Sequence, residues 1–117
     1  MNDPARMVEA CRAADAAEAA AYADMYAGAP AGVRTQLGLQ VREISGATLL
    51  LAPGLPVPIF NRVIGLGTFE PATQSALDRI LATYADAGVT SHWISVSPAA
   101  QPVELTGWLG ARGLAPP

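Results

Sequence analysis

Apolar and polar positions along this chain follow two different periods, and the change between them marks the expected elements. Residues 5–27 are rich in alanine, which has the highest helix propensity, and the preceding Asp3-Pro4 is typical of a capped helix start. Apolar residues recur there at helical spacing, so one long helix that ends in residues 28–32 is predicted. Its apolar stripe is expected to contain Met7, Cys11, Ala14, Ala21 and Met25. Its solvated side is expected to contain Arg6, Glu9, Arg12, Asp15 and Glu18.

The middle of the chain alternates with the period of two that is typical of strands. Residues 37–44 and 47–52 predict two strands joined by the tight turn Ser45-Gly46, which together form a β-hairpin. Residues 53–58 contain three prolines and predict a rigid surface loop, since proline removes a backbone donor. Residues 59–66 predict a third strand, and Gly65-Leu66-Gly67 indicates a strand end that requires open backbone dihedrals.

The C-terminal part alternates helix with strand. A helix is expected to open at residues 70–73 and to end at Gly88, a strand is expected at residues 92–96, and Pro102 is expected to open a last helix. The first of these helices has an apolar stripe of Leu77, Ile80, Leu81, Tyr84 and Ala87. The last one has an apolar face of Val103, Leu105, Trp108 and Leu109. The order α-β-β-β-α-β-α predicts a single domain over residues 1–117, of the α+β class (an α/β layer), with a mixed sheet.

Composition narrows the possible partners and the compartment. A chain of 117 residues that is 51% hydrophobic can form one domain with a core, and its net charge of −3 without a basic patch argues against nucleic-acid binding. No apolar run reaches the roughly 20 residues of a membrane span, and no secretory signal is recognisable. The single cysteine fits a reducing, cytoplasmic setting. With one cysteine and one histidine, no metal site is expected.

A few side chains could carry chemistry, and each also has a purely structural interpretation. His92 is interpreted as a packed or edge histidine rather than a general base, Trp93 as a core or helix-packing residue, and Cys11 as a small buried hydrophobe. Arg62 has two interpretations. It could bind a phosphate or a carboxylate through its planar guanidinium, or it could pair with Glu43 or another surface carboxylate.

The element order over residues 37–114, closed by the phrase LGARGL at residues 109–114, resembles the GNAT superfamily of N-acetyltransferases. Residues 61–67 (NRVIGLG) further resemble the N-terminal domain of tandem GNAT-like proteins, a domain that is often degenerate. The resemblance implies acetyl-CoA as cofactor and a small amine as substrate. The cofactor contacts that it implies are Val63, Ile64, Gly65, Leu66, Gly67 and Thr73. The substrate contacts that it implies are Asn61, Arg62 and His92.

The sequence departs from the family pattern at three places. The phosphate motif of the family, Gln/Arg-x-x-Gly-x-Gly/Ala, falls on residues 68–73, where Glu70 would repel phosphate and Pro71 lacks a backbone donor. The position of the family's tyrosine general acid falls on Leu109, which cannot donate a proton, so no catalytic residue is identified. The last two strands of the family have no counterpart before residue 117.

Three functions are therefore open, and the departures favour the first. The chain could be a degenerate, non-catalytic GNAT-like domain that serves as a scaffold, dimerisation or ligand-sensing module. It could be an active acetyl-CoA-dependent N-acetyltransferase that works mainly by positioning an amine. It could also be a small α+β domain that binds a metabolite or a protein through residues 53–58. An open sheet edge would favour a homodimer, or pairing with a second GNAT-like domain.

Overall fold

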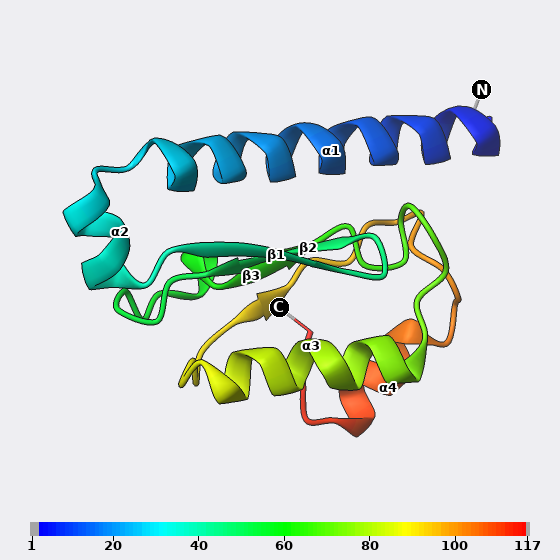
Figure 1. Cartoon of the computed structure of the whole chain (residues 1–117). Helices are drawn as coiled ribbons and strands as arrows, with labels where there is room; N and C mark the ends of the chain where they lie inside the picture. Colours follow the sequence, from blue (N-terminus) through cyan, green and yellow to red (C-terminus); the bar gives the residue numbers. More distant parts are fainter. Residues whose placement is uncertain (1–2, 117) are drawn as a thin grey trace.

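A four-stranded sheet separates two helical layers in this protein (Figure 1). The computed structural model describes residues 3–116, so Met1, Asn2 and Pro117 lie outside the described residues. Helix α1 lies along one face of the sheet, and α3 and α4 lie on the other (Figure 1), so the predicted α+β class is confirmed. The elements are α1 (Pro4–Gly28), α2 (Ala31–Leu37), β1 (Gln40–Ile44), β2 (Ala47–Leu51), the 3-10 turn η1 (Pro58–Phe60), β3 (Arg62–Ile64), α3 (Gln74–Asp86), β4 (Trp93–Ile94) and α4 (Leu105–Ala111).

The sheet has the strand order β1-β2-β3-β4 and is mixed. Strands β1 and β2 form the predicted antiparallel hairpin, in which Ser45 and Gly46 both have positive φ, as a two-residue hairpin turn with right-handed strand twist requires. Strand β3 pairs antiparallel with β2, with Thr48 opposite Ile64. Strand β4 pairs parallel with β3, and α3 lies between them in the chain as a crossover. Both outer strands, β1 and β4, therefore have a free edge among residues 3–116.

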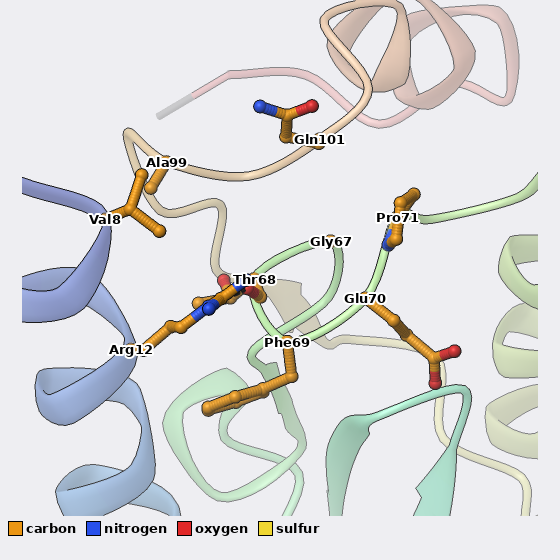
Figure 2. A pocket seen from close by; sticks show the side chains of 9 residues that line it. All are labelled: Val8, Arg12, Gly67, Thr68, Phe69, Glu70, Pro71, Ala99 and Gln101. Atoms are coloured by element: carbon orange, nitrogen blue, oxygen red, sulfur yellow. Dashed lines mark hydrogen bonds between the residues drawn. The ribbon is translucent and has the colours of Figure 1, made fainter. Parts of the chain in front are cut away.

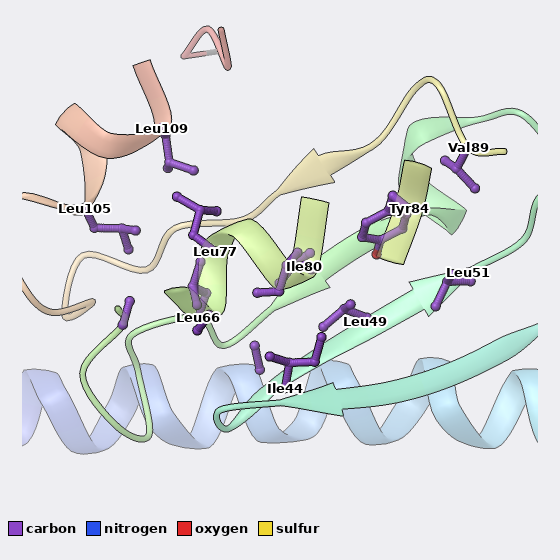
Figure 3. Close-up of a cluster of buried hydrophobic side chains, with 14 residues drawn as sticks. Ile44, Leu49, Leu51, Leu66, Leu77, Ile80, Tyr84, Val89, Leu105 and Leu109 are labelled. Atoms are coloured by element: carbon purple, nitrogen blue, oxygen red, sulfur yellow. The ribbon is translucent and has the colours of Figure 1, made fainter. Parts of the chain in front are cut away.

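The main core lies between the sheet and the α3–α4 layer (Figure 3). The predicted stripe of α3 is confirmed, because Leu77, Ile80 and Tyr84 are fully buried there. The hydroxyl of Tyr84 donates to the carbonyl of Leu50 at 2.9 Å, which fastens α3 to the sheet. On the opposite face a smaller cluster joins Tyr26 of α1 to Leu50 and Ile64.

Helix α1 contacts the sheet with a different side from the one that the sequence predicts. Met7 and Met25 were expected on the buried stripe, but both are 48% exposed, and Cys11 is only half-buried. The side that faces the sheet carries Tyr26 and, toward the N-terminus, Asp15. The reason is that α1 has few large apolar residues, so one buried tyrosine and a set of polar contacts determine its orientation.

The short strands differ from their predicted lengths for local reasons. The strand expected over residues 59–66 is reduced to β3 because Pro58 begins a 3-10 turn and Gly65 takes φ 88°. The strand expected over residues 92–96 is reduced to β4, and Trp93 is 54% exposed rather than packed in the core, because β4 is the outermost strand.

One additional helix and two helix starts also differ from the prediction. The sequence does not predict helix α2, because the glycine- and proline-rich residues 28–32 are expected to end helical structure and residues 37–44 to form a strand. Since α2 extends to Leu37, β1 begins only at Gln40. Helix α3 begins after Thr73 rather than near Pro71, because the hydroxyl of Thr73 accepts from the N–H of Ala76 at 3.0 Å as an N-cap. Helix α4 begins at Leu105 rather than at Pro102, because the residues between them form a turn, and Val103 is 85% exposed.

Candidate functional site

The candidate site lies where the chain leaves β3 and turns toward α3. Gly65 and Gly67 have φ of 88° and 79°, which confirms the predicted need for open dihedrals at this strand end. The N–H of Gln101 donates to the carbonyl of Gly67 at 2.9 Å, and the carbonyl of Gln101 accepts from the N–H of Ala72 at 2.7 Å. A Cβ atom on Gly67 would lie 2.6 Å from the carbonyl oxygen of Gln101. The segment before α4 is therefore fastened closely against the end of β3.

A cavity of about 280 Å³ opens beside this contact (Figure 2). Val8 and Arg12 of α1 form one wall, residues 67–71 form the floor, and Ala99 and Gln101 form the other wall. The carboxylate of Glu70 points away from the other lining side chains, toward the β1–β2 hairpin (Figure 2). The cavity thus has one cation at its rim, the guanidinium of Arg12.

Polar side chains of α1 hold this loop in place. The Nε–H of Arg12 donates to the carbonyl of Thr68 at 3.0 Å, and the hydroxyl of Thr68 donates to the carboxylate of Asp15 at 2.8 Å. Thr68 is 3% exposed, and its hydroxyl and its carbonyl are both paired with side chains of α1. The sequence pattern placed Arg12 and Asp15 on the solvated side of a helix. Only the three-dimensional packing brings them to Thr68, 53 or more residues away in the chain.

The implied cofactor contacts are largely buried in the fold. Residues 63–67 are buried, with Val63, Ile64 and Leu66 in the two apolar clusters, and Thr73 caps α3. Their backbone, rather than their side chains, could contact a cofactor. Part of that backbone is already bonded internally, because the N–H of Thr68 donates to Gly65 at 3.1 Å and Gly67 accepts from Gln101.

The three implied substrate contacts do not converge on one place. Asn61 is fully buried, and its amide bonds to the N–H of Ala52 at 2.7 Å and to the carbonyls of Ala52, Leu55 and Val57. It therefore holds the proline-rich loop closed. Arg62 points to the α1 side of the sheet, whereas His92 packs on the α3 side.

Arg62 is engaged with α1. Its NH1 lies 3.2 Å from the carboxylate of Glu18 and 3.4 Å from the hydroxyl of Ser95, and its guanidinium carbon lies 5.1 Å from the ring centre of Tyr22. The partner carboxylate is Glu18 rather than Glu43. The arginine side chain is 11% exposed and the glutamate 45%, so the ion pair stabilises the fold by about 1 kcal/mol at most. Its Nε has no hydrogen-bond partner among residues 3–116.

His92 stacks on Tyr84 with ring centres 4.7 Å apart, and Nδ1 has no partner in the described part of the chain. Burial lowers the pKa of His92 below its ordinary value of 6.5, because the charged imidazolium is poorly solvated there. Burial also raises the pKa of Tyr84, and it raises the pKa of Tyr26 to about 12. Both tyrosine hydroxyls donate to backbone carbonyls, those of Leu50 and Phe60, so neither is placed to act as a general acid.

The lowered pKa of His92 predicts a loss of stability in mild acid. As the pH falls from 7 to 5, the unfolded chain takes up a proton near pH 6.5 while the folded chain resists it, so the free energy of unfolding decreases. His92 is the only histidine of the chain, so a change in this pH dependence of stability on its substitution can be assigned to its imidazole. Urea denaturation at both pH values checks this: the His92→Phe variant is expected to lose less stability between them than the parent. An equal loss in both proteins would contradict the burial of a neutral imidazole.

Two other kinds of site find no support in the described residues. Among residues 3–116, no three His, Cys, Asp or Glu side chains gather in a way that could hold a metal ion. None of the helices in this range combines the length and the apolar character that a bilayer span needs.

Comparison of the chain with protein families, curated proteins and solved structures finds no match. Its function has to be inferred from its own geometry.

Proposed function

We propose that this chain is a GNAT-like domain without acetyltransferase activity, which acts through protein contacts as a scaffold or dimerisation module. In the family that the sequence resembles, the strand corresponding to residues 63–67 pairs with the pantetheine arm of acetyl-CoA, and the following loop binds its phosphates. The observation that carries the proposal is the double hydrogen bond of Gln101 to Gly67 and Ala72. The chain itself thus bonds the carbonyl of Gly67, one of the backbone groups that the resemblance assigns to the cofactor, which supports a non-catalytic role.

The chemistry around this segment agrees with a non-catalytic role. Leu109, at the position of the family's general acid, is buried in the core at 8% exposure. Pro71 offers no N–H in the loop before α3, and the hydroxyl of Thr73 already caps that helix. Asn61 is fully used in holding a loop.

The test is a calorimetric titration of the whole chain with acetyl-CoA and, separately, with CoA. No saturable heat is expected up to about 1 mM ligand, which corresponds to a binding free energy weaker than about −4 kcal/mol. A known acetyl-CoA-binding protein, titrated under the same conditions, shows that the ligand is intact. Saturable binding at micromolar concentration would overturn the proposal and would support an acetyl-CoA-dependent acyltransferase that acts on an amine.

A further inference from the structure

The outer side of β4 is an unpaired sheet edge. The N–H groups of Trp93 and Ser95 donate to the carbonyls of Asn61 and Val63, at 3.1 and 3.0 Å, and so point toward β3. Because neighbouring residues of a strand direct their backbone groups to opposite sides, the N–H and the carbonyl of Ile94 point outward. Within residues 3–116, no hydrogen bond uses either group. A strand with this geometry can accept one more strand at its side.

This edge is apolar and carries no charge. Residues 89–103 contain no Asp, Glu, Lys or Arg. Trp93, Val96 and Val103 are 54%, 39% and 85% exposed, and an open groove of about 420 Å³ lies between Val96 and Thr106. Exposed aromatic and aliphatic side chains beside a free edge favour association, because burying them removes apolar surface from water.

The opposite edge of the same sheet, β1, is protected against pairing with another chain by charged side chains. Strand β1 exposes Arg42 and Glu43, and charged side chains on an edge strand discourage pairing with another chain. The two edges therefore differ in charge: β1 carries charged side chains that discourage pairing with another chain, whereas β4 carries none.

We propose that β4 pairs antiparallel with β4 of a second copy of this chain, about a two-fold axis that passes between Ile94 and Ile94 of the partner subunit; this inference rests on the proposed function. A second copy fits because an edge without charge meets its own copy without like-charge repulsion. The outward N–H and carbonyl of Ile94 would bond to Ile94 of the partner subunit. Trp93 would then face Ser95 of the partner subunit. The two charged β1 edges would remain at the outside, so the assembly closes as a dimer.

Strand pairing over a few residues does not hold a dimer by itself, since specific interfaces bury about 1,200 Å² or more. Additional apolar area at this edge comes from the exposed Trp93 on one face of the sheet, and from the exposed Val96 and Val103 that line the groove. Trp93 and Trp93 of the partner subunit would be diagonal neighbours, a separation of about 7–8 Å at which large side chains still touch.

Sedimentation velocity of the full chain between about 1 and 200 µM tests the inference, because a dimer responds to concentration by mass action. A species of about 24 kDa, twice the 12.0 kDa of one chain, is expected. Trp93→Lys is expected to weaken association at least tenfold, since it removes apolar area and brings two like charges together. Val103→Lys changes a side chain that is 85% exposed, so it tests the same surface with little effect on folding. The matched control is Val41→Lys on the β1 edge, where Val41 is 38% exposed, and it is expected to leave association unchanged.

A monomer at every concentration would overturn the inference, and so would a dimer that only Val41→Lys disrupts. These outcomes are separate from the failure of the proposed function. A monomer that does not bind acetyl-CoA overturns the dimer alone, whereas a dimer that binds acetyl-CoA overturns the non-catalytic role alone.

Discussion

Asn61→Ala is expected to lower the free energy of unfolding by about 3 kcal/mol, because a buried polar group that loses its partner costs about 1–3 kcal/mol. The side-chain amide is fully buried and makes four hydrogen bonds to the backbone of Ala52, Leu55 and Val57. Its removal leaves the N–H of Ala52 unpaired in a dry environment and also deletes the donor that joins the carbonyls of Ala52, Leu55 and Val57. Urea denaturation monitored by circular dichroism gives the change.

The matched control is Gln40→Ala, which removes an amide of similar size that is exposed and accepts a hydrogen bond from Arg42 at 2.9 Å. It is expected to change stability by less than about 0.5 kcal/mol. A loss below about 1 kcal/mol for Asn61→Ala would mean that the loop does not depend on this amide. Asn61 would then be free to contact a ligand, as the family resemblance implies.

Gly67→Ala is expected to destabilise the protein by about 2 kcal/mol more than Gly88→Ala, since overpacking typically costs 1–3 kcal/mol. Both glycines have positive φ, 79° and 77°, so both variants carry the same backbone strain of about 1–2 kcal/mol. A Cβ atom at Gly67 would meet the carbonyl oxygen of Gln101 at 2.6 Å, whereas nothing lies within 4 Å at Gly88. The difference between the variants isolates the contact with Gln101.

Amide hydrogen exchange gives a local reading of the same contact. The N–H groups of Gln101 and Ala72 are expected to exchange faster in Gly67→Ala than in Gly88→Ala, because the added methyl group separates the two segments. Equal destabilisation by the two variants, with unchanged exchange at both amides, would show that residues 97–101 do not press against Gly67. The central support for the proposed function would then be lost.

The sequence by itself determined the elements whose patterns are local. The alanine-rich segment forms a long helix because propensity acts residue by residue. The Ser45-Gly46 turn closes the hairpin because two residues with positive φ suit that turn. The stripe of Leu77, Ile80 and Tyr84 is buried as its spacing predicts.

Parts of the site could be predicted for the same reason. The two glycines after β3 were expected to need open dihedrals, and they have them. The absence of a glycine or arginine in residues 68–73 is visible in the sequence alone. The hydrogen bond between Gln101 and Gly67 is not visible there, because the two residues lie far apart along the chain and meet only through their backbone.

Only the tertiary structure decided which polar groups are available to a ligand. Asn61 looks like a strand residue, but the loop that folds over it uses its whole amide. Arg12, Asp15 and Glu18 look like the solvated side of a helix, yet they contact Thr68 in the loop after β3 and Arg62 in β3. Periodicity records how apolar and polar residues repeat within one element, whereas these contacts depend on how separate elements are placed against one another.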